Sequence, residues 1–298
     1  MKSFLKAIFT EKQWEKLSKI KKKFYKYILV SIIKIFPDRV LLDVKSIAEI
    51  KRKMDYGRHE IFLNIDSEIE LNVRLHSCEK EPEIVKWIET FFTKGDVFYD
   101  IGANVGAYSL VAAKYLSKKI KIYAFEPGFI NFVQLCKNTF MNNCQEDIIP
   151  LQIALSDKTG INIFNYNNLS SGGALHTLGQ PIDFKGSIFE PVFRQLILSY
   201  RIDDFVRQFN LPIPNHIKID VDGIEFEILK GAGEILRSSL VKSVFVELQE
   251  GEEKSEKTIS FLLNKGFKFY SKHRYVYGNP TGPTTKNYNY IFKKTHDS

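Results

Sequence analysis

The chain of 298 residues has few of the features that mark several classes of protein. Its three cysteines, Cys78, Cys136 and Cys144, are widely spaced and form no CxxC or Cys/His pattern, so we expect neither a disulfide framework nor a zinc site. No apolar run reaches about 20 residues, the length that a membrane-crossing helix needs. Hydrophobic residues nevertheless make up 44% of the chain, enough to bury a core. We therefore expect a folded protein with buried, reduced thiols.

Positive charge is concentrated at the N-terminus. Residues 1–26 contain nine lysines and two glutamates, a net of +7, which leaves +1 of the chain's +8 for everything that follows. The apolar stretch 27–37 is about half a bilayer crossing long, contains Lys34 and stops at Pro37. We expect residues 1–40 to form a helical arm that either lies on an anionic membrane surface or covers a protein surface with its apolar side. No secretory signal pattern is present, and we expect a cytoplasmic protein, peripheral to a membrane at most.

Residues 97–106, VFYDIGANVG, are the most informative stretch of the chain. The apolar run predicts a buried parallel strand that contains Asp100 and opens into a turn bracketed by Gly102 and Gly106, where backbone can approach a ligand closely. The helix that follows directs its free N–H groups toward the same ligand. The next apolar run, KIYAFEP, places Glu126 at the ligand edge of an open α/β sheet. A carboxylate at that point can accept hydrogen bonds from the two hydroxyls of a ribose.

The glycine spacing separates two classes of cofactor. A dinucleotide fingerprint needs glycine where this chain has Asn104, which disfavours an NAD-dependent oxidoreductase. The pattern D-x-G-x-N-x-G instead resembles the first motif of class I methyltransferases, which bind S-adenosylmethionine (SAM). Six blocks between about residues 95 and 289 follow one another in the order found in FkbM-type methyltransferases: GDVFYDIGANVGAYSLVAA, YAFEPGFINFVQL, IIPLQIALSDKTG, SSGGALHTLG, IKIDVDGIEFEILKGAGEIL and VFVELQE.

This resemblance implies the fold, the activity and the cofactor site. The implied fold is α/β of the class I (Rossmann-like) methyltransferase type: a mostly parallel seven-stranded sheet with helices on both faces and a terminal antiparallel hairpin. The implied activity is SAM-dependent methyl transfer to a hydroxyl oxygen of a sugar, as in a cell-surface glycan, or of a small metabolite. The methionine end of SAM would be held by Asp100, Gly102, Asn104 and Gly106, and its ribose by Glu126. Ser156 and Asp157 would meet the adenine, although S-D-K-T-G is equally typical of a plain turn.

The pattern of apolar residues divides the chain into three parts. Residues 1–40 are the arm, residues 41–94 a cap with a β-hairpin (59–66 and 69–75) and a helix (81–92), and residues 95–298 the methyltransferase domain. Strands are predicted at 97–101, 120–125 and 148–154, and helices at 106–117 and 129–142. The alternation pauses at about 155–200, where we expect an insertion over the cofactor edge. Its Ser170, Ser171, His176 and Gln180 are suited to hydrogen-bonding a polyhydroxylated acceptor.

Transfer to a hydroxyl needs a group that accepts its proton. Asp220, at the end of the strand in IKIDVDG, is the first candidate, with Lys218, Glu247 and His176 as further catalytic candidates; Asp222 and Glu225 also lie in this region. Purely structural roles also fit several of these residues. Lys218 and Asp220 have the spacing of an ion pair on one face of a strand, and Glu225 has the position of a carboxylate at a helix N-terminus. Glu247 inside an apolar strand is costly unless paired.

Several alternatives stay open from the residues alone. Asp220, Asp222 and Glu247 would together suit a divalent metal, although we expect none, because D-x-D spacing is common. The basic arm would suit an RNA methyltransferase, but the domain after it carries almost no excess positive charge, so no nucleic-acid partner is expected. A non-catalytic binding module that keeps the fold is a further alternative. The oligomeric state cannot be derived from the sequence.

Overall fold

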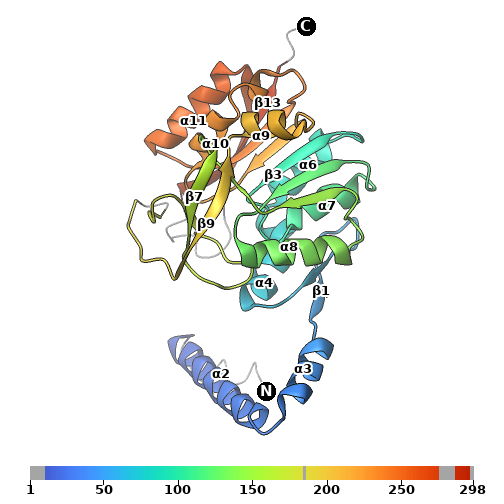
Figure 1. Ribbon diagram of the computed structural model, residues 1–298, viewed down its shortest axis with the longest axis vertical. Coiled ribbons are helices and arrows are strands. Elements are labelled where there is room, and N and C mark those ends of the chain that lie inside the picture. The colour runs from blue at the N-terminus through green and yellow to red at the C-terminus, as the bar shows by residue number, and fades with distance from the viewer. Residues whose placement is uncertain (1–10, 184–185, 275–285, 296–298) are drawn as a thin grey trace. The chain divides into compact units, whose positions relative to one another are not determined.

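The computed structural model describes residues 11–183, 186–274 and 286–295, and the chain divides into two units, 1–50 and 51–298. In the first unit, α2 (Glu11–Ile33) and α3 (Asp38–Ile47) are separated by a turn that ends at Pro37 (Figure 1). Residues 1–10 of the predicted arm lie outside the described residues. None of the described helices combines the length and the apolar character that a bilayer crossing requires.

The second unit is built on a seven-stranded sheet in the order β12-β13-β11-β10-β3-β4-β5. Its strands are β3 (Val97–Ile101), β4 (Lys121–Phe125), β5 (Ile148–Leu151), β10 (His216–Ile219), β11 (Ser243–Gln249), β12 (Phe267–Arg274) and β13 (Asn287–Lys294). The five from β5 to β11 are parallel, and β13 pairs antiparallel with both β11 and β12. This confirms the predicted sheet with its terminal hairpin. The strand order reverses between β3 and β10, which is where open α/β sheets bind ligands.

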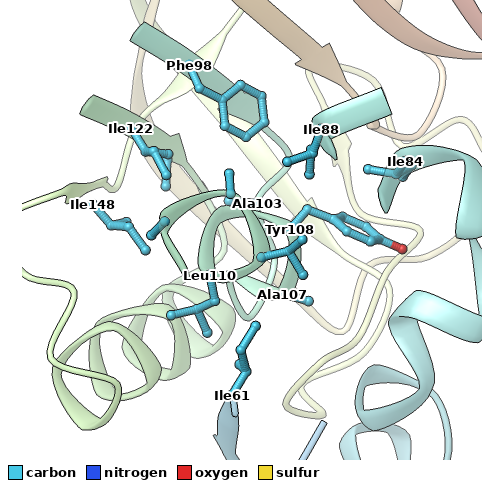
Figure 2. Packing of buried hydrophobic residues seen from close by; sticks show 14 of the residues in the cluster. Ile61, Ile84, Ile88, Phe98, Ala103, Ala107, Tyr108, Leu110, Ile122 and Ile148 are labelled. Carbon is cyan, nitrogen blue, oxygen red and sulfur yellow. The ribbon is translucent and has the colours of Figure 1, made fainter. Parts of the chain in front are cut away.

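Helices cover both faces of this sheet because successive strand residues point to opposite sides. Phe98, Ile122 and Ile148 belong to one buried cluster with α6 (Pro82–Phe91), α7 (Ala107–Tyr115) and α8 (Phe129–Met141). Figure 2 shows these strand residues above Ala107 and Leu110 of α7, with Ile84 and Ile88 of α6 beside them. Tyr99, Ile217 and Val244 belong to a second cluster, which includes residues of α9 (Ile202–Phe209), α10 (Glu225–Gly231) and α11 (Glu253–Asn264).

The predicted hairpin of residues 59–66 and 69–75 is wrong. The strand β2 (Phe62–Asn64) pairs instead with β1 (Lys51–Lys53), and the second half forms α4 (Glu68–Asn72) and the 3₁₀ helix η1 (Arg74–His76), followed by α5 (Ser77–Lys80). Ser67 and Glu70 form a capping box, in which the Glu70 N–H donates to Ser67 Oγ and the Ser67 N–H donates to the Glu70 carboxylate. The S-x-x-E spacing of a helix start therefore outweighs the apolar alternation that predicted a strand.

The insertion forms a second sheet of four strands, in the order β6-β9-β7-β8. Its strands are β6 (Ala154–Leu155), β7 (Gly160–Tyr166), β8 (Thr177–Leu178) and β9 (Phe193–Tyr200). The predicted strand 148–154 is thus split between the two sheets. No strand was expected between residues 189 and 201, because β9 carries apolar residues on both faces: Ile197 is buried, whereas Leu196 and Leu198 are exposed and pair with the exposed Ile163 and Ile161.

Gly102 packs so closely that we expect its replacement to destabilise the fold. Its φ is +76°, and a Cβ atom there would lie 2.0 Å from the carbonyl oxygen of Asp220. Gly102→Ala should lower the free energy of unfolding of the cofactor-free protein in urea by about 2–5 kcal/mol, from backbone strain and overpacking together. Gly57→Ala, where a Cβ would meet nothing within 4 Å, should change it by less than about 0.5 kcal/mol. Equal stability of the two variants would contradict this packing.

Candidate active site

Glu126 holds together the turn after β3 and the end of β4. Its Oε2 accepts a hydrogen bond from the Asn104 N–H at 2.9 Å, and its Oε1 accepts one from the Gly128 N–H at 2.9 Å. The side chain is buried, and burial raises the pKa of its carboxyl group to about 7 although these backbone donors act in the opposite direction. The carboxylate that the sequence assigns to a ribose is therefore fixed in place by backbone groups on both sides.

The two glycines of the turn face protein atoms. Gly102 approaches the backbone of Asp220 at the end of β10, and a Cβ at Gly106 would lie 2.6 Å from Cδ1 of Leu135 in α8. Gly102, Asn104 and Gly106 all have positive φ values, so the turn is left-handed at three points. The sequence predicted close approach to a ligand at these glycines. In the structure they bring the turn against the backbone that follows β10 and against α8.

Asp100 and Lys218 form an ion-pair network inside the sheet. The Lys218 ammonium lies 3.1 Å from Asp100 Oδ1 and 3.2 Å from Asp220 Oδ2, and it donates to the Gly102 carbonyl oxygen at 3.4 Å. Burial alone would lower the pKa of Lys218, but the two carboxylates outweigh it and hold that pKa above its usual range. The second oxygen of Asp100 accepts from Ser109 Oγ at 2.6 Å. Lys218 therefore stays protonated and has no lone pair with which to accept a proton, and both Asp100 oxygens are used internally.

Asp220, Glu247 and Glu81 form an acidic cluster at the carboxyl ends of β10 and β11. Burial opposes ionisation of Asp220, but Lys218 and Lys80 hold its pKa below the usual range. Burial, Asp220 and Glu81 raise the pKa of Glu247 well above its usual range, so Glu247 keeps its proton and donates it in a hydrogen bond to Asp220. One proton is thus held between two neighbouring carboxyl groups.

Glu81 is a member of this cluster that sequence reasoning missed. It is buried at the start of α6, where it accepts hydrogen bonds from the Tyr108 hydroxyl, from Lys80 Nζ at 3.0 Å and from Asn289 Nδ2 at 3.4 Å. Figure 2 shows the Tyr108 hydroxyl pointing out of the apolar cluster toward the chain that carries Ile84. A glutamate just before a helical pattern looks like a helix-terminal charge, and its charged neighbours Lys80 and Glu83 leave no signal in the sequence that singles it out.

An apolar pocket lies beside Glu126, at the carboxyl ends of β3, β4 and β10. Its walls include Ile101, Phe125, Pro127, Leu155, Val221 and Ile228. Asp222 and His176 are its ionisable lining residues within the described chain. Ser156 and Asp157, predicted to meet an adenine, are not among the lining residues: Asp157 instead pairs with Lys230 at 2.8 Å, which lowers the pKa of its carboxyl group.

The loop between β7 and β8 reaches this pocket with His176. Its Nδ1 accepts from the Asn167 N–H at 3.2 Å, and burial, together with the positive charge of Arg74, lowers its pKa to about 4. The neutral imidazole therefore carries its proton on Nε2, as a donor rather than a proton acceptor. Nearby, burial raises the pKa of Asp222 to about 6, and burial raises that of Glu225 to about 8.

The same loop is held by hydrogen bonds from two directions. On the cap side, Ser67 Oγ donates to the Ser171 carbonyl oxygen and Ser171 Oγ to Glu70 Oε1, each at 2.6 Å. On the cofactor side, the Asn104 and Asn131 side-chain amides donate to the Gly173 carbonyl oxygen at 2.8 and 3.0 Å. Of the residues predicted to bind an acceptor, Ser171 is therefore used to fix the loop.

The structure offers no converging metal ligands at Asp220, Asp222 and Glu247. In the described ranges, one group of three acidic or histidine side chains has its ligand atoms within 4.8 Å of one another. This group is Asp55, His76 and Glu79, in the cap. The two oxygens of Asp55 accept from the backbone N–H groups of Cys78 and Glu79, at 3.0 and 2.7 Å. Those acceptor bonds explain the convergence without an ion.

Comparison with known proteins identifies the family. The sequence model described as the methyltransferase FkbM domain matches residues 100–269, more than half of the chain. The chain therefore belongs to the FkbM methyltransferase family. It is 27% identical over 185 residues to the hexuronic acid methyltransferase AglP of Haloferax volcanii, which covers 62% of this chain and 69% of that protein. It is also 27% identical over 196 residues to the methyltransferase sdnD of Sordaria araneosa, covering 56% and 72%.

Among solved structures, the chain resembles an FkbM methyltransferase from Methylobacillus flagellatus, with a TM-score of 0.46 and 16% identity. The aligned part covers 67% of this chain and 44% of that one, so this chain spans less than half the length of that protein. The class I fold rests on the strand order of the sheet itself and on membership of the family.

The raised pKa of Glu126 predicts how stability depends on pH. Its folded-state pKa of about 7 exceeds the ordinary 4.5, so the folded protein holds the proton more tightly than the unfolded chain. Between these two pH values, the contribution of Glu126 to the free energy of unfolding should fall as pH rises, by roughly 3 kcal/mol in all. Glu126→Gln should remove this part of the slope, measured by urea unfolding at pH 4.5 to 7.5.

Glu60→Gln provides the control, because the Glu60 carboxylate is exposed to water in the folded and in the unfolded protein. In this variant the wild-type dependence of the free energy of unfolding on pH should persist. If Glu126→Gln keeps the wild-type slope as well, Glu126 is not desolvated in the folded protein.

Proposed function

We propose that this methyltransferase uses SAM and transfers the methyl group to a hydroxyl oxygen of a sugar or of a small metabolite. The observation that carries the proposal is an unfilled hydrogen-bond acceptor in the turn after β3. The side-chain oxygen of Asn104 is buried and has no hydrogen-bond donor among the described residues. A buried acceptor without a donor is costly, and a bound ligand with an N–H group relieves that cost.

The residues of the site fit the three parts of SAM. Asn104 Oδ1 would accept from the ammonium of the methionine part. Glu126 would accept from the ribose hydroxyls with its remaining lone pairs, since each oxygen is already bound to one backbone N–H. The apolar walls of the pocket beside Pro127 and Val221 are suited to a flat adenine ring. When bound, SAM supplies a methyl group on an activated sulfonium leaving group.

Asp220 is the proposed proton acceptor. Its carboxylate is ionised, its side chain is 27% exposed, and it ends the strand next to the turn that holds the cofactor. An oxygen that gains a methyl group becomes strongly acidic as positive charge develops on it, so a weakly basic carboxylate suffices at that point. Lys218 fixes the position of Asp220, and the Glu247 hydroxyl supports its charge. Lys218 and Glu247 are accordingly assigned to positioning rather than to proton transfer.

The surroundings of Asp220 support a neutral, polar acceptor. Glu81 and Glu247 lie in the same acidic cluster, and Asn287 Nδ2 donates to Glu247 Oε1 at 2.9 Å while Asn287 Oδ1 has no donor within the described chain. These groups are suited to hydroxyl groups, which donate and accept. The name of the relative AglP, a hexuronic acid methyltransferase, supports a sugar as the acceptor.

Asp220→Asn tests the assignment of the proton acceptor. With labelled SAM and fractionated cell extract as the source of acceptor, the wild type should label one fraction. Asp220→Asn should lower transfer by about 10²- to 10⁴-fold, the usual contribution of a general base. Its affinity for SAM, measured by calorimetry, should stay within about threefold of the wild type, because Asp220 is assigned to the acceptor side.

Asp204→Asn, on the exposed side of α9 in a pair with Arg207, serves as the control and should transfer at the wild-type rate. Full transfer by Asp220→Asn would exclude it as the base, and Asp222 would then be the next residue to test. A wild type that binds no SAM would refute the proposed function.

We further propose that the arm binds an anionic membrane surface. In α2, the apolar Leu17, Ile20, Phe24 and Ile28 are exposed and have the spacing of one helix face. Lys16, Lys19, Lys23 and Lys26 form a basic stripe on the adjoining face of the same helix. After residue 26 the helix continues with apolar residues only, up to its end at Ile33, apart from Ser31. A basic face beside an apolar face is typical of helices that lie in the membrane interface.

Vesicle flotation tests this surface. The protein should float with vesicles that contain phosphatidylserine and not with vesicles of phosphatidylcholine alone. Replacing the four lysines of that face by glutamine should weaken partitioning at least about tenfold, since each contributes on the order of 1 kcal/mol near an anionic surface. The double replacement of Lys51 and Lys53, in the second unit, should leave it unchanged. A wild type that stays with the soluble fraction in both cases would refute the membrane contact.

A further inference from the structure

Arg74 is held at the active site by a single backbone carbonyl group. It lies in η1, and its Nε and Nη2 both donate to the Gly172 oxygen, at 2.9 and 2.7 Å. The side chain is half-buried, and within the described ranges no carboxylate lies within 4.0 Å of its guanidinium group. A guanidinium group has five N–H donors, so a neutral carbonyl leaves most of its hydrogen-bonding capacity and all of its charge uncompensated.

The other cations near the site are already neutralised by ion pairs. Lys218 is bound by Asp100 and Asp220, and Lys80 lies 3.0 Å from Glu81. Arg74 differs from both lysines because it has no carboxylate partner among the described residues. Its positive charge nevertheless acts on Glu126, Asp222 and His176: it lowers the pKa of His176 further and opposes the rise that burial causes in the pKa of the two carboxyl groups. A positive charge therefore acts on the predicted ribose carboxylate and on two residues that line the pocket, with no anion of the described chain bound to it.

The hydrogen bonds of the loop place Arg74 next to Asn104. Arg74 binds the carbonyl oxygen of Gly172, and Asn104 Nδ2 binds that of Gly173, the next residue. Consecutive Cα atoms are about 3.8 Å apart. Two side chains anchored on neighbouring carbonyl groups thus present a cationic donor and an unfilled acceptor, Asn104 Oδ1, close together. An α-amino acid carries the complementary pair, a carboxylate and an ammonium on one carbon atom.

We propose that Arg74 binds the carboxylate of the methionine part of SAM, while Asn104 binds its ammonium. The inference rests on the proposed function and adds a cofactor contact from the cap, outside the 100–269 segment that defines the family. The same chemistry would be met by the carboxylate of an acidic sugar acceptor, so the experiment has to distinguish these two sources of a carboxylate. In both cases Arg74 acts through a charge-assisted, bidentate hydrogen bond.

Decarboxylated SAM isolates the interaction, because it keeps the sulfonium and the ammonium and lacks only the carboxylate. By calorimetry on the full chain, the wild type should bind SAM ~10- to 100-fold more tightly than decarboxylated SAM, as expected for a hydrogen bond to a charged group. Arg74→Gln should lower the affinity for SAM by a similar factor and change that for decarboxylated SAM by less than about threefold.

Ser171→Ala is the matched control for the loop. It removes the hydrogen bond from Ser171 Oγ to Glu70, which fixes the same loop, but leaves the charge of Arg74, so any loss should be equal for the two nucleosides. An equal loss in Arg74→Gln would overturn the proposal and leave Arg74 with a role in fixing the loop only.

A second experiment uses D-glucuronate and D-glucose as probes in the presence of saturating SAM. If Arg74→Gln keeps full SAM affinity but loses binding of D-glucuronate and not of D-glucose, the carboxylate belongs to the acceptor and the SAM assignment is overturned. Wild type that binds neither nucleoside would refute the proposed function itself. Wild type that binds both equally well would refute only the role of Arg74.

Discussion

The buried ammonium of Lys218 is the interaction on which the site depends. It joins β3 to β10 at the point where the strand order reverses, through Asp100 on one strand and Asp220 just past the end of the other. It also binds the carbonyl oxygen of Gly102, so the turn that follows β3 is fixed by the same charge. Breaking such a buried group by removing one partner typically costs 3–5 kcal/mol, because the others are left uncompensated. Its value to the protein lies in placing a carboxylate in a fixed position at the edge of the sheet.

The second fixed element is the loop of residues 170–173, which belongs to the insertion in sequence but to the candidate active site in space. The capping box of α4 positions Glu70, and Glu70 accepts from Ser171. Asn104 and Asn131 bind the same loop from the opposite side. Local helix capping, loop conformation and the cofactor turn are therefore linked in one hydrogen-bonded chain. This explains why a segment with no regular structure contributes to a site that requires fixed geometry.

The central strands could be predicted because they are buried on both faces, which leaves nearly continuous apolar runs such as VFYDI and VFVEL. The turn at Gly102 and the position of Glu126 followed from the same pattern, since carboxyl ends of parallel strands meet at one edge. The cap was harder to predict. Residues 69–75 alternate like a strand, and only the capping spacing of Ser67 and Glu70 distinguishes them from one.

The parts of the site that could not be predicted come from outside the strand ends. Arg74 lies in a three-residue 3₁₀ helix and Glu81 lies just before α6, and nothing in the local sequence relates either of them to residues more than twenty positions away. The internal use of Asp100 was also hidden, because the spacing of Asp100 and Ser109 does not tell whether a carboxylate faces a ligand or a neighbouring helix. Tertiary contacts decided each of these roles.

The way the cap enters the site has a consequence for what counts as the smallest working piece of this enzyme. A polypeptide that starts at Gly95 would retain every strand of the seven-stranded sheet and all the sequence blocks that mark the family. It would nevertheless lose Glu70, Arg74 and Glu81, and with them an anchor for the loop, a cation and a carboxyl group. The residues that mark the family and the residues proposed to complete the site are therefore encoded in different segments. If Arg74 binds as proposed, divergence of the short segment ahead of the sheet would alter binding at the site while leaving the family signature intact.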